Sequence, residues 1–389
     1  MIRKFFATAA KGMEPLLLEE IQALGAQDIQ SSVGGVAFQG TLETAYKVCL
    51  WSRVASRVLM PISEFGAPTP EKLYGGVRQI RWSQHMRPDQ TLAVDFTSIR
   101  SAITHTQFGA QKTKDAVVDQ FQSIAGSRPS VDLARPDLRL NIYLKENHAI
   151  LSIDLSGDGL HRRGYRQQDT GAPLRESLAA AILLHAGWPK IAEQGGGLID
   201  PMCGSATLPI EAGLMATQTA PGLNRDYFGF LGWLQHDAPA WERLKAEAQS
   251  IREQRMKKPL PPIAGFDEDF RAIHGGIQNV ERAGMRGIVH LEKRELNLTQ
   301  PLSISSPTAQ PRGIFIVNPP YGERMGEEEA LGELYTKIGD TLKQKFKGWE
   351  GYVFTGSPEL SKKIGLKASK RIVLFNGPIE CRLFKFELY

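Results

Sequence analysis

The sequence is poor in cysteine and has no long apolar run. Its 389 residues include three cysteines, Cys49, Cys203 and Cys381, which lie far apart and form no Cys-x-x-Cys pair. This spacing argues against a disulfide framework and a structural zinc site, and we expect no metal. The chain has no run of about 18 consecutive apolar residues, and the short apolar stretch near its start ends at Lys11, too early for a signal peptide. We therefore expect a cytoplasmic protein with no membrane association.

The chain also has only a small excess of positive over negative charge. The chain has 47 Lys and Arg against 42 Asp and Glu, a formal net charge of +5. Such a small excess is in the direction expected of a nucleic-acid binder but does not establish one. The 42% hydrophobic and 23% charged residues are typical of a soluble globular protein and exclude global disorder. The length predicts two or three domains.

Strand-like and helix-like patterns alternate along the first part of the chain. Residues 5–8 and 35–38 predict strands, and residues 15–24 and 42–59 predict helices, which together indicate a small α/β unit. The prolines and glycines of residues 61–75 then predict a boundary or a long loop. A second α/β unit follows to about residue 155. Its predicted strands are 91–96, 138–144 and 149–155, the last two forming a hairpin.

A third region begins after the glycine-rich and basic stretch 157–166, which we interpret as a linker. The predicted strands 197–200, 263–267 and 313–318 alternate with helices, so they indicate a doubly wound parallel sheet. Near the end, residues 371–386 form two β-rich runs around an Asn-Gly turn signal. This pattern predicts a terminal antiparallel hairpin.

The first candidate site is the turn Asp-Pro-Met-Cys-Gly-Ser-Ala-Thr at 200–207, between a strand and a helix. Small residues let a cofactor approach backbone N–H groups at a helix N-terminus, and a carboxylate at a strand tip can hold a cationic or hydroxyl-bearing cofactor. Taken alone, the segment is more typical of an ordinary turn, because Gly204 is the only glycine left of the three in the nicotinamide fingerprint.

Two further acidic residues follow predicted strands. Asp267 is placed to accept hydrogen bonds from both hydroxyls of a ribose. It lies 63 positions after Gly204, where a simple unit needs about 20, so the intervening stretch is interpreted as an insertion. Glu295 is a candidate acceptor for an adenine amino group, although a solvated loop charge is at least as consistent with the sequence.

The second and stronger site is Asn-Pro-Pro-Tyr-Gly-Glu-Arg at 318–324, directly after an apolar strand. Two prolines fix a rigid backbone at the carboxyl end of a strand, where ligands bind in open α/β sheets. If the Asn318 side-chain oxygen and the Pro319 carbonyl accept the N–H groups of an exocyclic amine, its lone pair can turn toward an electrophile. Tyr321 would then stack on the base.

Together these two motifs resemble class I S-adenosylmethionine-dependent methyltransferases that modify nucleobase amino groups, and more closely the THUMP-domain RNA methyltransferases. Residues 106–116 are similar to the THUMP signature, and residues 154–166 to the exit from that domain. With 221–223 and 233–237, they make the chain similar to the bacterial 23S rRNA guanine-N2 methyltransferases that form the N-terminal half of a fused two-methyltransferase protein.

The resemblance implies an α/β fold in three domains: a ferredoxin-like domain at 1–65, a THUMP RNA-binding domain at 66–156, and a Rossmann-like methyltransferase domain with a terminal antiparallel hairpin at 157–389. It implies S-adenosyl-L-methionine as cofactor, with Ala172, Pro173 and Leu174 near its methionine end. The other cofactor residues that we expect are Asp200, Pro201, Met202, Cys203, Gly204, Ser205, Thr207, Asp267 and Glu295. The catalytic residues that we expect are Asn318, Pro319, Pro320 and Tyr321.

The chain departs from the family at two of these positions. Ala206 stands where the family usually has glycine, and Glu295 where it usually has aspartate. The chain also stops at Tyr389, so we expect the second methyltransferase of the fused form to be absent.

Several basic residues are candidates for RNA phosphates. A further basic stretch, 337–371, holds nine Lys and Arg against three Asp and Glu, but charged surface helices have the same composition. The single residues proposed for RNA contact are Lys112, Lys114, Arg162, Arg163 and Arg166.

We therefore expect an enzyme that methylates the N2 amine of a guanine in 23S rRNA or in a large-subunit assembly intermediate. One alternative is an N6-adenine methyltransferase acting on RNA or DNA, since the Asn-Pro-Pro-Tyr chemistry serves any exocyclic amine. Another is a non-catalytic RNA-binding assembly factor. The sequence does not fix the oligomeric state.

Overall fold

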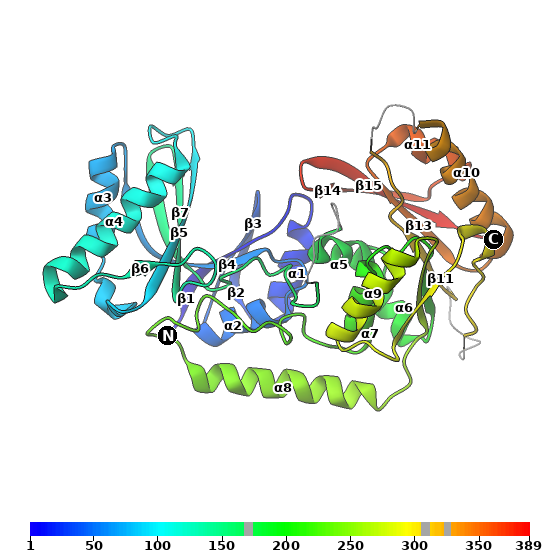
Figure 1. The fold of residues 1–389 in the computed structure, drawn as a ribbon, viewed down its shortest axis with the longest axis horizontal. Coiled ribbons are helices and arrows are strands. Elements are labelled where there is room, and N and C mark those ends of the chain that lie inside the picture. The colour runs from blue at the N-terminus through cyan, green and yellow to red at the C-terminus, as the bar shows by residue number, and fades with distance from the viewer. Residues whose placement is uncertain (167–173, 305–311, 323–327) are drawn as a thin grey trace. The chain divides into compact units, whose positions relative to one another are not determined.

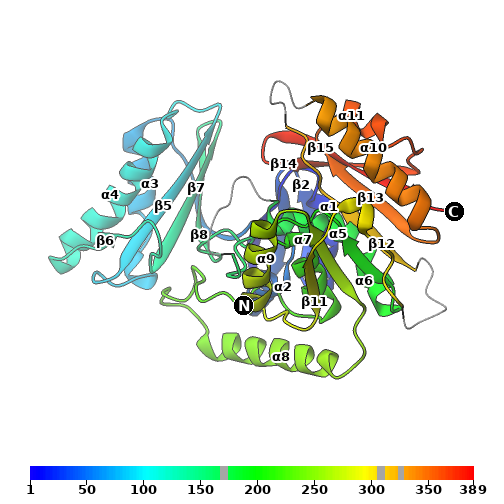
Figure 2. The ribbon, with the colours of Figure 1, turned by 45° about the vertical axis from the view of Figure 1, so that its right-hand side comes forward.

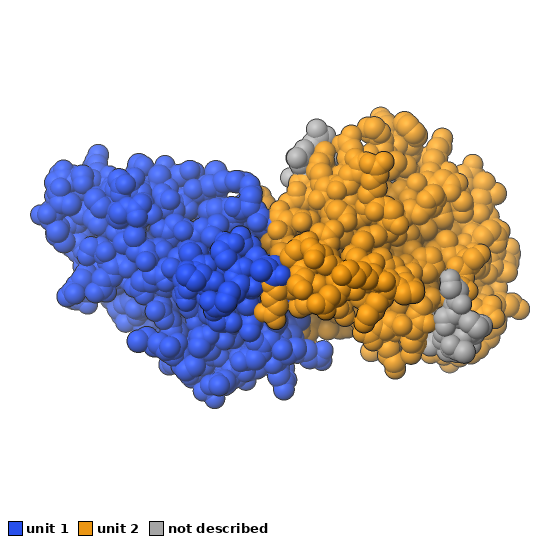
Figure 3. Space-filling model, turned by 90° about the horizontal axis from the view of Figure 1, so that it is seen from below, with its two compact units in different colours: residues 1–9, 17–160, 225–246 blue, residues 10–16, 161–224, 247–389 orange. Residues whose placement is uncertain are grey.

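The computed structural model describes residues 1–166, 174–304, 312–322 and 328–389 (Figure 1). The chain divides into two compact units, which Figure 3 distinguishes by colour. Unit 1 comprises Met1–Ala9, Leu17–Leu160 and Arg225–Ala246, and unit 2 comprises Ala10–Leu16, His161–Asn224 and Glu247–Tyr389. Each unit is built around its own sheet. No helix within the described residues is both long and apolar enough to span a membrane.

Unit 1 contains an eight-stranded sheet in the order β2-β3-β1-β4-β8-β7-β5-β6. The strands are β1 (Arg3–Thr8), β2 (Gln27–Ser32), β3 (Gly35–Gly40), β4 (Arg57–Gly66), β5 (Thr91–Ile99), β6 (Ser130–Val131), β7 (Leu138–Lys145) and β8 (His148–Asp154). The helices in this part of the chain are α1 (Glu14–Ala23), α2 (Leu42–Trp51), α3 (Pro70–Arg78) and α4 (Thr106–Ala125), with a 3-10 turn at Trp82–Gln84.

The first half of this sheet has the order of elements that a ferredoxin-like domain requires. β1 lies between β3 and β4 and is antiparallel to both, and α1 and α2 connect the strands. β4 also pairs along β8 from Leu59 to Gly66, which joins the two halves into one sheet. In the second half, β7 and β8 form the predicted hairpin, and β5 runs parallel to β7.

The helix predicted over 42–59 is too long, and of the two alternatives for residues 61–75 the long loop is wrong. The predicted helix over 42–59 ends at Trp51, and its last residues belong to β4. The predicted loop is instead the rest of β4 followed by α3, which Thr69 caps by accepting a hydrogen bond from the backbone of Lys72 at 3.3 Å. β4 tolerates Pro61 because β1 pairs only with Arg57 to Leu59, and the register with β8 shifts just after the proline.

The aromatic part of the predicted insertion, residues 225–246, packs within unit 1. Trp233 is buried and donates its indole N–H to Nδ1 of His85 at 3.1 Å, and the rings of Tyr46 and Phe230 pack in a tilted arrangement with centroids 4.3 Å apart. The long helix α8 (Ala238–Met256) then leads back to unit 2. The insertion therefore contributes to the core of unit 1 although it lies between two strands of unit 2 in the sequence.

Unit 2 contains a seven-stranded sheet in the order β11-β10-β9-β12-β13-β15-β14 (Figure 2). Its elements in chain order are α5 (Glu176–His185), α6 (Trp188–Glu193), β9 (Gly197–Asp200), α7 (Thr207–Ala216), β10 (Ile263–Asp267), α9 (Phe270–Arg282), β11 (Val289–Lys293), a 3-10 turn at Leu296–Leu298, β12 (Gly313–Val317), α10 (Glu328–Lys345), β13 (Glu350–Thr355), α11 (Pro358–Lys363), β14 (Lys370–Asn376) and β15 (Ile379–Glu387).

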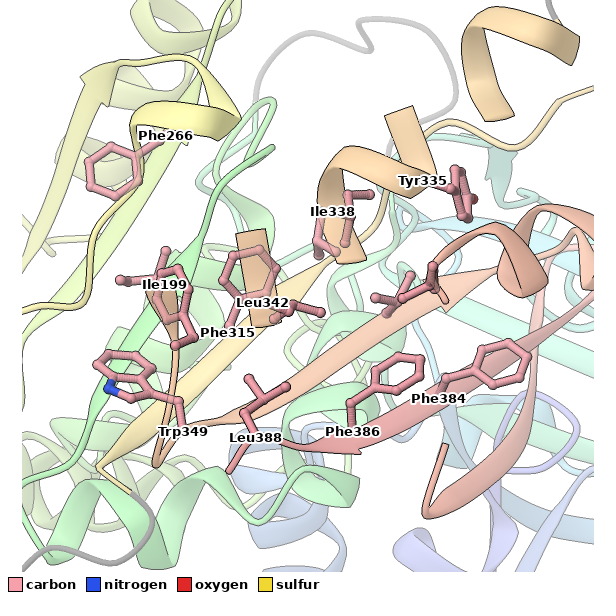
Figure 4. Packing of buried hydrophobic residues seen from close by; sticks show 14 of the residues in the cluster. Ile199, Phe266, Phe315, Tyr335, Ile338, Leu342, Trp349, Phe384, Phe386 and Leu388 are labelled. Atoms are coloured by element: carbon pink, nitrogen blue, oxygen red, sulfur yellow. The ribbon is translucent and has the colours of Figure 1, made fainter. Parts of the chain in front are cut away.

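The five strands β9 to β13 are parallel, and β14 and β15 form the predicted antiparallel hairpin at the edge of the sheet. The strand order reverses between β9 and β12, so the carboxyl ends of these two strands flank the crevice where doubly wound sheets bind ligands. Figure 4 shows part of the core of unit 2, where Ile338 and Leu342 of α10 pack with Phe315 of β12 and Phe386 of β15.

Candidate functional site

The turn after β9 is held to the tip of β10 by backbone hydrogen bonds. The Gly204 N–H donates to Oδ2 of Asp267 at 2.9 Å, and the Cys203 N–H donates to the Phe266 carbonyl at 2.8 Å. Asp200 ends β9, and its Oδ1 accepts the Met202 N–H at 3.1 Å. These contacts fix the backbone of residues 200–204 beside the second strand tip.

The same turn uses left-handed backbone conformations. Gly204 has φ +53°, and Ala206, at the N-cap of α7, has φ +66°. A side chain in this region costs roughly 1–2 kcal/mol, whereas glycine adopts it freely. The glycine that the family usually has at position 206 therefore matches the geometry, and Ala206 keeps the same backbone path at an energetic cost.

A cavity of about 430 Å³ lies over this turn. It brings together Leu174 and six of the predicted cofactor residues of the turn with Asn318 from the end of β12. It also includes four residues around the start of α9 that sequence reasoning missed: Asp269, Arg271, Ala272 and Gly275. The predicted residues that line the cavity are Leu174, Asp200, Met202, Cys203, Gly204, Ser205, Thr207 and Asn318.

A signal for the missed residues was present in the sequence. Asp269 follows the strand tip by two positions and caps α9 by accepting the Arg271 N–H at 2.8 Å. A carboxylate just after a strand and just before a helix is a helix-start pattern, and it places the first turn of that helix at the ligand edge of the sheet.

The carboxyl group of Asp200 has a strongly raised pKa. Its side chain is 2% exposed, and burial raises its pKa to about 8, with the neighbouring charge of Asp267 acting in the same direction. Burial also raises the pKa of the Cys203 thiol well above its ordinary value, so this sulfur stays protonated and is not a nucleophile. Bringing a cation or a hydroxyl donor next to Asp200 would offset the cost of its buried charge.

Neither Asp267 nor Glu295 lines the cavity, but Asp267 is hydrogen-bonded to two residues that do, Gly204 and Asp269. Both Asp267 oxygens accept backbone N–H groups, Oδ2 from Gly204 and Oδ1 from Asp269 at 3.0 Å. Each oxygen keeps a second lone pair for a ligand. Glu295 is exposed and caps a 3-10 turn after β11, while its neighbour Arg294 lies 4.2 Å over the Phe266 ring.

Asn318 directly follows β12 and lines the cavity. Its Oδ1 is buried, and no group among the described residues donates a hydrogen bond to it. A buried acceptor without a donor costs roughly 1–3 kcal/mol, so such an atom indicates a site built for an incoming N–H group. Pro319 is buried, and Pro320 is exposed.

Tyr321 is half-buried, and its hydroxyl is tied to the terminal hairpin. The hydroxyl oxygen accepts from Nδ2 of Asn376 at 2.8 Å and from the Cys381 thiol at 3.6 Å. Burial raises the pKa of Tyr321 to about 12, so its hydroxyl stays neutral and is not a general base at physiological pH. Further along the chain, the Tyr335 hydroxyl of α10 donates to the Pro320 carbonyl at 3.4 Å.

Two of the basic residues proposed for RNA contact are bonded inside unit 2, which argues against that role: Arg163 is buried and Arg166 is partly buried. Arg163 is 2% exposed, and its Nε lies 3.6 Å from a carboxylate oxygen of the buried Glu211. Arg166 donates to Oγ1 of Thr207 at 2.5 Å and to the Leu174 carbonyl at 3.3 Å. Glycine- and arginine-rich sequence suggests an exposed linker, but here carboxylates and carbonyls inside unit 2 bind these guanidinium groups.

The remaining predicted residues are more dispersed. Arg162 is exposed, Lys114 pairs with Asp115, and Lys112 lies 5.2 Å over the Tyr74 ring. Pro201 belongs to the turn after β9 but does not line the cavity. Ala172 and Pro173 lie outside the described residues, as do Glu323 and Arg324 of the second motif.

These features define a Rossmann-like methyltransferase fold with a candidate nucleobase-amine site at its switch point. Residues 163–385 match the family described as RMKL-like, methyltransferase domain, and the chain belongs to that family. Residues 4–59 match the RlmL ferredoxin-like domain and residues 67–154 the THUMP domain. The predicted fold class is thus confirmed, as is the resemblance.

Relatives of known name agree with this assignment. The chain is 53% identical over 388 residues to the ribosomal RNA large subunit methyltransferase K/L of Methylococcus capsulatus, covering all of this chain and 52% of that protein. The chain thus spans about half the length of the curated relatives it matches. It is 31% identical to SMU.472, provisionally named a methyltransferase and crystallised with SAH, with a TM-score of 0.85 over 100% of this chain and 98% of that one.

A second solved structure gives the same result. A possible methylase from Clostridium difficile 630 is 28% identical, with a TM-score of 0.86, covering 100% of this chain and 99% of that chain. Its match over the full length of both chains shows that the two units occur together in other proteins.

Proposed function

We propose that this protein uses S-adenosyl-L-methionine to methylate the exocyclic N2 amine of a guanine in 23S rRNA. The observation that carries the proposal is the buried Asn318 Oδ1, an acceptor that no described group satisfies, on a residue that lines the cavity over the β9 turn. The relatives named ribosomal RNA large subunit methyltransferase K/L support the substrate class.

The cavity fits the cofactor. Its volume falls within the range of about 300–1,000 Å³ typical of small-molecule sites, and its lining combines the carboxylates of Asp200 and Asp269 with small residues of the turn and apolar side chains. We propose that Asp200 and the turn 201–207 hold the methionine and ribose parts, that Asp267 accepts from the ribose, and that Leu174 borders the methionine end. Because Glu295 does not line the cavity, it would contact the adenine amino group of the cofactor only at the rim of the cavity. The SAH-bound relative supports this use of the site.

When bound, S-adenosyl-L-methionine supplies an electrophilic methyl group. The chain's own task is to hold the amine, which is a weak nucleophile because its lone pair is delocalised into the base. Acceptance of its two N–H groups by Asn318 Oδ1 and the Pro319 carbonyl would fix the nitrogen and orient the lone pair. A strong base is unnecessary because the alkylated nitrogen is acidic and loses its proton to solvent, in agreement with the neutral Tyr321 hydroxyl.

We further propose that the substrate is 23S rRNA or a large-subunit assembly intermediate in the cytoplasm. The proposed domains are 1–65, 66–156 and 157–389, with the THUMP domain supplying RNA affinity. Lys112, Lys114 and Arg162 remain the candidate phosphate contacts, because they lie on the surface or at its edge.

The test is transfer of radiolabelled methyl from S-adenosyl-L-methionine to RNA fractions from a strain lacking this protein, followed by nucleoside chromatography. The proposal predicts N2-methylguanosine in large-subunit RNA. Label in N6-methyladenosine would instead support the adenine alternative. A structural relative from Listeria monocytogenes carries the name predicted N6-adenine-specific DNA methylase. Cofactor binding without transfer to any fraction would favour a non-catalytic assembly factor.

A further inference from the structure

The terminal hairpin contacts the ring that would lie against the target base. Asn376 is the last residue of β14, and its Nδ2 donates to the Tyr321 hydroxyl at 2.8 Å. Cys381 of β15 is fully buried and donates its thiol proton to the same oxygen at 3.6 Å. The hydroxyl oxygen therefore has two donors, both from the hairpin and both more than 50 residues away along the chain.

The ring itself is confined by the end of β13. A Cβ atom added at Gly356 would stand 2.9 Å from two carbons of the Tyr321 ring, closer than side chains approach one another. Glycine at this position thus allows the ring to lie directly against the backbone. The ring is therefore supported along one side by Gly356 and at its hydroxyl end by the hairpin.

The loop that carries Tyr321 is also fixed from α10. The buried Tyr335 hydroxyl lies 2.7 Å from Oγ1 of Thr355 and donates to the Pro320 carbonyl at 3.4 Å. Because prolines already restrict this backbone, the side-chain torsions of Tyr321 are the main remaining freedom. The hydrogen bond from Asn376 restricts those torsions.

We propose that Asn376 is a positioning residue for methyl transfer, which holds the plane of the Tyr321 ring through its hydroxyl while Cys381 completes the anchor. This inference rests on the proposed function, because it assumes that the Tyr321 ring contacts the target base. The terminal hairpin is then part of the target-base site, and its tip sets the orientation in which the base is received.

A double-mutant cycle tests this role. The variants are Asn376→Leu, Tyr321→Phe and the two combined, measured by single-turnover transfer to undermethylated 23S rRNA. Each single variant should lower the rate by roughly five- to tenfold, the effect of one lost hydrogen bond. The combined variant should be no slower than the slower single variant, because both changes remove the same contact. Losses that multiply, or an unchanged rate in Tyr321→Phe, would overturn the proposal.

Two further variants separate positioning from folding. Asn376→Asp should stay within about twofold of wild type, because the carboxylate can accept a hydrogen bond from the Tyr321 hydroxyl. Val373→Ala, on the opposite face of the same strand, should leave the rate unchanged. SAH affinity by calorimetry should be the same in all variants. A drop in SAH affinity with Asn376→Leu, or failure of Asn376→Asp to restore the rate, would indicate a general structural role.

A readout independent of turnover keeps this inference distinct from the proposed function. The protein labelled with 3-fluorotyrosine should give a Tyr321 fluorine resonance, assigned with Tyr321→Phe, that shifts or broadens in Asn376→Leu and not in Val373→Ala. If wild type transfers no methyl group, the proposed function fails, whereas the resonance still reports the anchor. A Tyr321 resonance that Asn376→Leu leaves unchanged overturns the anchor itself.

Discussion

The Gly204 N–H donates to Oδ2 of Asp267 at 2.9 Å across 63 residues of sequence. This contact joins the turn after β9 to the tip of β10, so the two acidic positions of the cofactor site share one backbone frame. Asp267 therefore has two tasks: it holds the turn, and we propose that it accepts from the ribose.

Asp267→Asn is expected to weaken SAH binding. The amide nitrogen cannot accept a backbone N–H, so one of the two bonds to Gly204 and Asp269 is lost together with the charge. Hydrogen bonds to charged groups contribute roughly 1.5–3 kcal/mol, which corresponds to a loss of about 10- to 100-fold in affinity. Calorimetry checks this, with the exposed neighbour Glu268→Gln as control. Equal SAH affinity in the two variants would contradict the dual role.

Ala206→Gly is expected to leave stability unchanged or to raise it by up to about 1 kcal/mol, because relief of the left-handed strain opposes the greater chain entropy of glycine. The same replacement at the exposed helical residue Ala246 should instead cost about 1 kcal/mol. Thermal unfolding of both variants and of wild type measures these two changes in stability. A loss in Ala206→Gly as large as in Ala246→Gly would show that position 206 is not strained.

Asp200 should make stability fall as pH rises from about 4 to about 8. Burial raises its folded-state pKa from 3.8 to about 8, so within that window the folded protein holds a proton that the unfolded chain has lost. One such group contributes a slope of at most about 1.4 kcal/mol per pH unit, which disappears above pH 8. Urea unfolding between pH 6 and 9 should show a shallower decline for Asp200→Asn. Identical slopes in both proteins would refute the buried, protonated state.

Arg166→Gln should weaken SAH binding several-fold, because its guanidinium holds Oγ1 of Thr207 and the carbonyl of Leu174, two residues of the cavity wall. Arg162→Gln, four positions earlier and exposed, is the matched control. It should bind SAH normally and bind 23S rRNA more weakly. RNA binding reduced by Arg166→Gln with SAH affinity intact would restore the original RNA assignment of Arg166.

The sequence predicts most of the fold and the main contents of the cavity because the relevant signals are local. A buried strand followed by a turn of small residues, or by Asn-Pro-Pro-Tyr, places those side chains at a sheet edge whatever the rest of the chain does. The helix over 42–59 is overextended because the apolar residues of β4 continue the helical spacing past Trp51.

Long-range pairings leave no such local pattern. The burial of Arg163 depends on Glu211, and the anchoring of Tyr321 depends on Asn376 and Cys381, neither of which has a recognisable spacing in the sequence. The contribution of residues 225–246 to unit 1 likewise depends on partners such as His85, far away along the chain. Side-chain contacts between distant segments are therefore the part that required the structure.

The most direct test of the central claim compares Asn318→Ala with wild type in methyl transfer to undermethylated 23S rRNA, with SAH affinity measured on the same samples. If the unsatisfied Asn318 Oδ1 receives the target amine, the variant loses transfer by at least about 100-fold, as expected when a well-oriented contact at the reacting atom is removed, while SAH affinity stays within about twofold. Full transfer by Asn318→Ala would contradict the account.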